Sequence, residues 1–171
     1  MADLQQPGSF TAPNEPAKLP SGLNTLTILT LIGCGIGFIF TVYNFFSAKT
    51  SLDKMEATIN SPEFDKMPDF AKKMMSPEAM DVMRKSYENR IPLTLIGLVG
   101  LALCLVGAMQ MRKLKAQGYL LYVIGEVLPL IGSLIFVGVA AFSGMGGIFM
   151  IGFTLLFIIL YTTQRKYLIN K

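Results

Sequence analysis

Long runs of apolar residues, almost free of charge, alternate with polar segments along the chain. Residues 23–46, 91–111 and 145–164 contain no charged side chain, and residues 119–142 contain only Glu126. Each run approaches or exceeds the roughly 20 residues that an α-helix needs to cross about 30 Å of hydrocarbon. Because backbone in lipid must satisfy its own hydrogen bonds, such unbroken runs predict helices rather than barrel strands. We therefore expect an all-α, four-transmembrane-helix bundle within one domain, residues 23–171.

Residues 47–90 form the one long polar segment between these predicted spans. The segment holds eight basic and eight acidic residues, so its net charge is zero. Its apolar residues recur at three- and four-residue spacing, which predicts short amphipathic helices. Two Ser-Pro-Glu triplets, at residues 61–63 and 76–78, are typical helix starts, with a capping Ser, a Pro in the first turn and an acid near the positive end of the helix dipole. We expect an extramembrane loop with short helices.

The remaining connections are short, so neighbouring spans should pack as antiparallel hairpins. Four spans put both termini and residues 112–118 on one side of the membrane. That side carries seven basic residues against two acids: Lys18, Arg112, Lys113, Lys115, Arg165, Lys166 and Lys171 against Asp3 and Glu15. The positive-inside rule then predicts cytoplasmic termini, although the eight basic residues of the loop leave the opposite orientation open. Residues 1–22 are proline-rich and polar and predict a flexible tail, and we expect the first span to act as its own membrane signal.

The amino-acid composition excludes several kinds of protein and of catalytic site. The mean hydropathy is +0.52 and 52% of residues are hydrophobic, which is too apolar for an ordinary soluble domain. The chain has no histidine, which excludes His-ligated haem and most catalytic zinc sites. It also has no phosphate-binding Gly-rich loop, GxSxG or CxxC motif. We expect no catalysis, no cofactor, no metal and no nucleic-acid partner.

Methionines in residues 47–90 raise a copper(I) alternative, because thioethers are soft ligands. They are Met55, Met67, Met74, Met75, Met80 and Met83. Their helical spacing favours an apolar face that contacts lipid or a protein partner.

Small residues recur at spacings that permit close helix approach in membranes. Gly33 and Gly37 form a GxxxG motif; Gly100, Cys104 and Ala108 follow at four-residue spacing; Gly118, Gly125 and Gly132 lie seven residues apart. We expect these positions to pack helices together, either within the chain or between copies of it. Cys34 and Cys104 lie near the centres of apolar runs, where a thiol behaves as a small hydrophobe.

Glu126 is the most informative residue, because a charged side chain within the membrane is costly and usually serves a function. It shares one helix face with Tyr119, Tyr122, Pro129 and Ser133. Pro129 cannot continue the hydrogen bond to the Gly125 carbonyl, so we expect a free carbonyl beside the carboxylate.

Possible partners at similar depth are Thr27, Thr30, Gln110, Arg112 and Tyr161. Among these, an Arg112–Glu126 ion pair is our preferred prediction.

Two functions are compatible with these features. The first is a non-enzymatic accessory or interaction subunit that docks a membrane partner, or a second copy, through residues 47–90. The alternative is a small transporter or channel component in which Glu126 binds a proton or cation beside a Pro-broken helix. A third interpretation of Glu126 itself is a hydrogen-bonded acid that only fixes helix register.

Several segments resemble a family of uncharacterised small bacterial membrane proteins. They are LPSGLN at 19–24, MQMRKLK at 109–115 followed by GY at 118–119 and GE at 125–126, and QRKY at 164–167. The resemblance covers most of the chain. It implies four helices in a bacterial inner membrane and implies no activity.

Overall fold

The computed structural model describes residues 19–168, and this part of the chain consists of helices joined by short turns and loops, with no strand. Four helices are long and apolar enough to cross a membrane: α1 (Ser21–Ile59), α4 (Arg90–Arg112), α5 (Ala116–Phe136) and α7 (Met145–Gln164). The prediction of an all-α chain with four spanning helices is confirmed, and the protein is a multi-pass membrane protein. The predicted flexible tail lies almost entirely outside the described residues.

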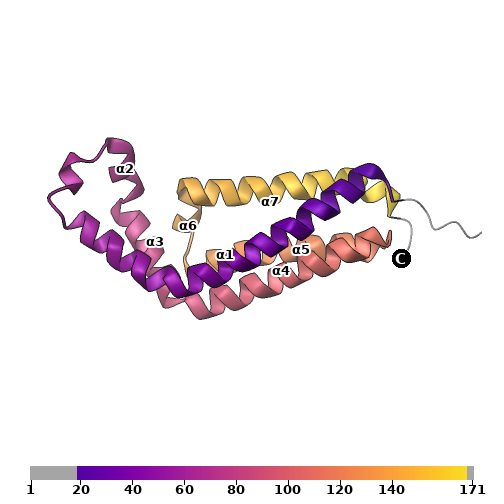
Figure 1. The fold of residues 1–171 in the computed structure, drawn as a ribbon, viewed down its shortest axis with the longest axis horizontal. Coiled ribbons are helices and arrows are strands. Elements are labelled where there is room, and N and C mark those ends of the chain that lie inside the picture. The colour runs from indigo at the N-terminus through magenta and orange to yellow at the C-terminus, as the bar shows by residue number, and fades with distance from the viewer. Residues whose placement is uncertain (1–18, 169–171) are drawn as a thin grey trace, which may run out of the picture.

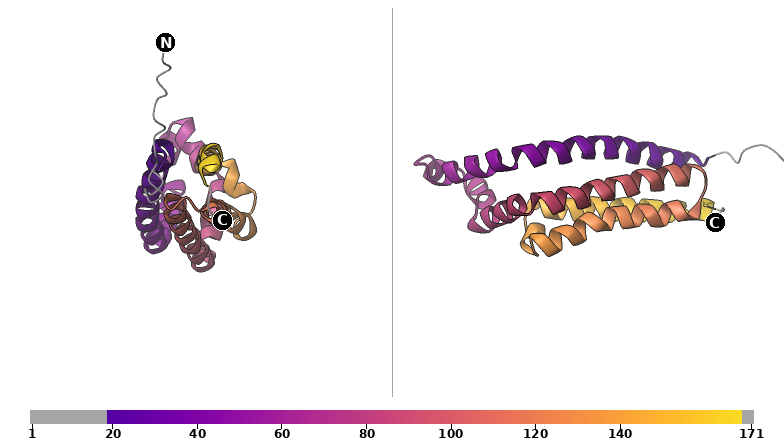
Figure 2. Two further views of the ribbon diagram at one scale, coloured as in Figure 1. Left: turned by 90° about the vertical axis from the view of Figure 1, so that its right-hand side faces the viewer. Right: turned by 90° about the horizontal axis from the view of Figure 1, so that it is seen from below.

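The spanning helices run side by side along the long axis of the molecule (Figures 1 and 2). The α4–α5 pair makes the closest contact, and a tight turn joins the two helices with Leu114 at a φ of 56°. α1 packs along α4, whereas α7 contacts α1 and α5 more sparsely. The start of α1, the α4–α5 turn and the end of α7 share one end of the molecule (Figure 1).

The first helix is longer than its apolar run. We expected a boundary at residue 46, but α1 continues without a break to Ile59. Residues 47–59 contain neither Gly nor Pro, and Leu52 and Met55 are buried where this extension packs against α3 (Pro77–Glu88). Hydropathy therefore marks where the apolar run ends, whereas packing on α3 decides how far the helix continues.

The rest of residues 47–90 before α4 comprises η1 (Phe64–Lys66), α2 (Asp69–Met74) and α3. As the second Ser-Pro-Glu triplet predicts, α3 begins at Pro77, and Ser76 Oγ accepts a hydrogen bond of 3.3 Å from the Ala79 amide. The first triplet leads only to the 3₁₀ turn of η1. An ion pair of 2.9 Å between Arg84 and Glu56 joins α3 to α1.

The predicted third span, residues 119–142, is not one helix. α5 ends at Phe136, and the amides of Val137 and Gly138 both donate to the Ser133 carbonyl, at 2.9 and 3.1 Å. Gly138 has a φ of +94°, a conformation that glycine adopts readily after a helix end. The chain then forms the short α6 (Ala140–Ser143) before α7.

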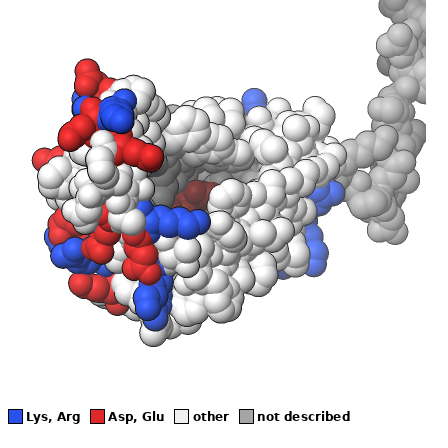
Figure 3. Space-filling model, turned by 60° about the vertical axis from the view of Figure 1, so that its left-hand side comes forward, with Lys and Arg blue, Asp and Glu red and all other residues white. Residues whose placement is uncertain are grey.

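Charged side chains gather at the end of the molecule that α2 and α3 form, while the sides of the spanning helices are largely uncharged (Figure 3). Large apolar side chains lie exposed along those helices, among them Ile39, Leu120 and Phe149, each more than 60% exposed. A patch of this extent would be exceptional on a soluble monomer and matches a lipid-facing surface.

Candidate functional site

The α4–α5 contact fixes the position of the helix that carries Glu126. Glycine backbones meet directly there: a Cβ atom at Gly125 would lie 2.7 Å from both Cys104 Sγ and the Gly100 carbonyl oxygen. Farther along the pair, a Cβ at Gly107 would lie 2.7 Å from the Gly118 carbonyl oxygen. Close approach of this kind requires residues without bulky side chains.

Five of the predicted packing residues lie in this contact, namely Gly100, Cys104, Gly118, Gly125 and Gly132. A Cβ at Gly132 would lie 3.0 Å from the Ile96 side chain. Gly107 was not among the predicted packing residues, although it lies seven residues after Gly100 and so repeats the seven-residue spacing of the glycines in α5.

The GxxxG motif of α1 does not form an equivalent contact. A Cβ at Gly37 would lie 3.0 Å from the Leu101 side chain, but one at Gly33 would meet nothing within 4 Å. The prediction that Gly33 packs a helix is therefore wrong for this chain alone. Gly33 instead borders the cavity described below.

Hydrogen-bond donors from three helices surround the Glu126 carboxylate. Tyr122 Oη, one turn earlier on α5, donates to Oε1 at 2.8 Å. Thr154 Oγ1 on α7 donates to Oε2 at 3.3 Å, and Cys104 Sγ on α4 lies 3.9 Å from Oε1. Tyr122 is only 1% exposed. Both carboxylate oxygens are therefore held in place by neutral groups.

A series of polar side chains leads from the Glu126 carboxylate toward the end of the molecule at which α1 begins. The rings of Tyr122 and Tyr161 lie 4.5 Å apart between centroids, and the Tyr161 hydroxyl shares a 2.7 Å hydrogen bond with Thr30. One turn earlier on α1, Thr27 accepts a hydrogen bond of 3.3 Å from Arg112. Tyr161, Thr27 and Thr30 are buried. They form a polar track between the carboxylate and the basic end of α4.

The preferred Arg112–Glu126 ion pair is not present. Arg112 ends α4 and bonds Thr27, whereas Glu126 lies ten residues into α5, about 15 Å along the helix axis. That separation is too long for the arginine side chain. Gln110 does not bond Glu126 either: its Oε1 atom is buried without a hydrogen-bond partner among the described residues.

Pro129 has a different role from the predicted one. Its ring packs against Gly100, where an added Cβ would lie 2.9 Å from Pro129 Cγ. The Gly125 carbonyl also faces Gly100, at 2.8 Å from the same position. Neither Gly125 nor Pro129 borders the cavity. The Gly125 carbonyl therefore belongs to the α4–α5 contact and does not lie beside the Glu126 carboxylate in the cavity, contrary to the prediction.

Glu126 borders a cavity of about 300 Å³ that all four spanning helices line. Most of the wall is apolar and includes Ile36, Leu101, Phe153 and Phe157. The space-filling view shows a hollow between the helices with acidic atoms at its floor (Figure 3). The cavity exists because α7 packs only sparsely against the other helices. A cavity of this kind, apolar with a few convergent polar groups, is typical of a small-ligand site.

The donor set limits what this cavity can bind. One carboxylate borders it, and no cluster of three or more His, Cys, Asp or Glu occurs among residues 19–168. Ca²⁺ takes six to eight oxygen ligands, and Mg²⁺ is usually held by one or two carboxylates together with several waters. The side-chain oxygens in this wall belong to Thr30, Tyr122 and Glu126. A proton requires one carboxylate, and an organic cation also gains from aromatic faces such as those of Phe153 and Phe157.

No family model, curated protein or solved structure matches this chain. The resemblance to a bacterial membrane family therefore stays a prediction.

Proposed function

We propose that the protein is a small, non-enzymatic transporter or channel component in which Glu126 binds a proton or a monovalent organic cation. One observation carries this proposal: the single carboxylate within the spanning bundle borders a cavity instead of pairing with a basic side chain. Glu126 is bonded by neutral hydroxyls and remains open on its cavity side.

The packing of the helices supports movement around this site. The α4–α5 pair is held by backbone-to-backbone approach and should act as one rigid unit. α7 contacts α1 and α5 only sparsely, and Gly147 near its start packs against the backbone of α6. Rocking of α7 against the rigid pair would change access to Glu126, which is the principle of alternating access.

The test is transport by the purified full-length protein in liposomes. Proton flux is measured with a trapped pH-sensitive dye under an imposed membrane potential, and tetraethylammonium uptake is measured in parallel. We expect wild type to move at least one of these cations and Glu126→Gln to fall to the background of empty liposomes, because the amide cannot carry the charge.

Asn44→Asp serves as the matched control, because it adds an acid on an exposed α1 position away from the cavity. It should transport as wild type does. Wild-type flux equal to that of empty liposomes, or undiminished flux through Glu126→Gln, would contradict the proposal.

An accessory subunit is the second candidate, and a specific surface favours it. Phe70 and Met74 lie one turn apart on α2 and are 62% and 56% exposed, although the extramembrane segment around them is rich in charge. Exposed apolar pairs of this kind often contact a partner. A partner or second copy that copurifies with wild type and Glu126→Gln, and is lost from Phe70→Ser/Met74→Ser, would support this function; equal recovery from all three would count against it.

For either function we propose both termini on the cytoplasmic side of a bacterial inner membrane. The end of the molecule that holds the α4–α5 turn and the end of α7 carries a compact basic group: Arg112, Lys113, Lys115, Arg165 and Lys166. The opposite end mixes basic and acidic residues (Figure 3). This asymmetry is the pattern that the positive-inside rule associates with the cytoplasm.

A further inference from the structure

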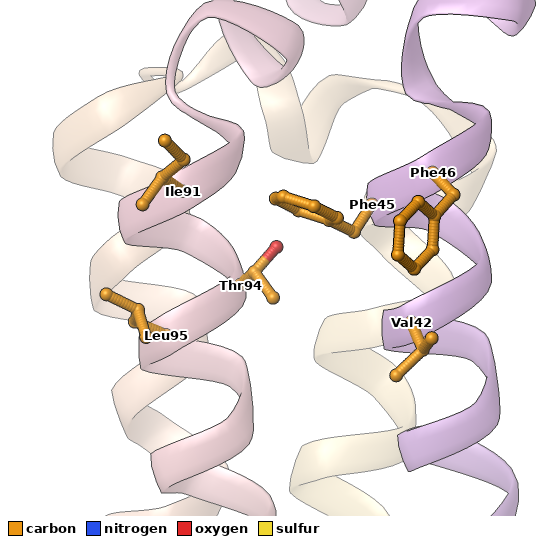
Figure 4. Close-up of a pocket in the computed structure, with 6 residues that line it drawn as sticks. All are labelled: Val42, Phe45, Phe46, Ile91, Thr94 and Leu95. Carbon is orange, nitrogen blue, oxygen red and sulfur yellow. The ribbon is translucent and has the colours of Figure 1, made fainter.

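A second cavity, separate from the Glu126 site, opens between α1 and α4 near the extramembrane end. Its volume is about 380 Å³, and it is lined by Val42, Phe45, Phe46, Ile91, Thr94 and Leu95. Phe45 and Thr94 lie between the two helices, and Ile91 and Leu95 lie along α4 (Figure 4). Five of the six lining side chains are apolar. The groove therefore suits a hydrocarbon chain.

The groove also lies open to the membrane. Phe46 is 76% exposed, and Ile91 and Leu95 are each 59% exposed. These side chains belong to the apolar runs that span the bilayer. The solvent on this face is therefore lipid, and an acyl chain can enter from the side.

Arg90 stands at the rim of the groove, next to Ile91. Its guanidinium lies 4.4 Å from the centre of the Tyr87 ring and 5.9 Å from that of Phe45, which itself lines the groove. Among the described residues, ion pairs form only between Arg84 and Glu56 and between Lys85 and Asp81, so no carboxylate neutralises Arg90.

A second cation lies in line with the groove. Lys49 follows Phe45 and Phe46 by four and three residues, so helical spacing puts it on the same face of α1, one turn nearer the extramembrane end. Asp53 is one turn beyond Lys49, farther from the groove. The rim thus presents positive charge directly above an apolar groove.

We propose that this groove is a binding site for an anionic phospholipid, with one acyl chain between α1 and α4 and the phosphate at Arg90. Three features favour a lipid over a protein helix. The groove opens into hydrocarbon, it carries cations only at the end near the membrane surface, and an arginine fork matches the oxygens of a phosphate. The contacts with the rings of Tyr87 and Phe45 orient the Arg90 guanidinium even without bound lipid.

The test is lipid retention by the purified full-length protein. The protein is reconstituted with equal amounts of phosphatidylglycerol and phosphatidylethanolamine that carry identical acyl chains, and the lipids kept after partial delipidation are measured by native mass spectrometry. We expect wild type to retain phosphatidylglycerol preferentially. Arg90→Gln should lower that preference about fivefold, the amount that one interfacial charge contributes.

Matched variants distinguish recognition of the lipid headgroup from binding of the acyl chain. Lys113→Gln, which removes a charge at the opposite end of α4, should keep the preference. Thr94→Phe, which fills the groove beside Phe45, should lower the retention of both lipids. Arg90→Lys tests the same site if Arg90→Gln does not fold, and it should keep part of the preference because charge remains without the fork.

Equal retention of the two lipids by wild type, or an unchanged preference in Arg90→Gln, would overturn the proposal. So would a loss of preference in Lys113→Gln as large as in Arg90→Gln, because the site would then not lie at Arg90. Glu126→Gln should retain lipid as wild type does, so this result is independent of the transport experiment.

Discussion

Gly125→Ala is expected to remove about 3 kcal/mol of stability, the upper end of the usual cost of overpacking, although it adds a single methyl group. The new Cβ would lie 2.7 Å from the Gly100 carbonyl oxygen and 2.8 Å from the Cys104 amide nitrogen. Both atoms belong to the backbone of α4, so no side-chain rotation relieves the overlap. The two helices would have to separate, and their remaining contacts would weaken.

Thermal unfolding of the detergent-solubilised protein measures this effect, followed by the loss of helical circular dichroism. Gly33→Ala is the matched control, because it adds the same methyl group to a spanning helix at a position with nothing within 4 Å. Its melting temperature should equal or slightly exceed that of wild type, since alanine favours helix more than glycine does. Equal melting temperatures for the two variants would show that α4 and α5 do not meet at Gly125.

The four spanning helices were predictable because a bilayer imposes a length and a composition on each of them. The ends of the helices were not, since they depend on contacts beyond the membrane. α1 continues past residue 46 because Leu52 and Met55 pack on α3. α5 stops at Phe136 because Gly138 adopts a left-handed conformation. The hydropathy of the sequence does not indicate which of the many glycines will end a helix.

The chemistry around Glu126 was predictable in part. Tyr122 follows from helical spacing, since it lies four residues earlier on the same face. Thr154 was missed, although a signal existed: it lies ten residues before the end of α7 at Gln164, and Glu126 lies ten residues after the start of α5 at Ala116. The start of α5 and the end of α7 lie at the same end of the molecule, so Glu126 and Thr154 lie at about the same depth in the bundle.

The cavity beside Glu126 could not be predicted from sequence. It arises from the sparse packing of α7 against α1 and α5, and that packing depends on side-chain shapes from several helices at once. The error about Gly33 has the same origin. A GxxxG motif shows that close approach is permitted, but whether a neighbouring helix uses that opening depends on the arrangement of the whole bundle.

Dicyclohexylcarbodiimide should modify Glu126 and leave the other acids of residues 19–168 unmodified. The reagent is apolar and concentrates in hydrocarbon, and the cavity that Glu126 borders is largely apolar. The carboxyl group adds across one C=N bond, and the resulting O-acylisourea rearranges to a stable N-acylurea. All other acids of this part of the chain lie in residues 47–90, which we propose are outside the membrane, where water hydrolyses the activated intermediate and regenerates the acid.

The intact mass of the protein should rise by one reagent equivalent, and fragmentation should place the added mass at Glu126. Glu126→Gln should show no increase. Prior incubation with tetraethylammonium should slow the modification if that cation binds beside the carboxylate. Labelling of wild type that is absent, or that persists in Glu126→Gln, would mean that the carboxylate is sealed within the bundle, and Glu126 would then be a structural acid that fixes the register of α5 against α4 and α7.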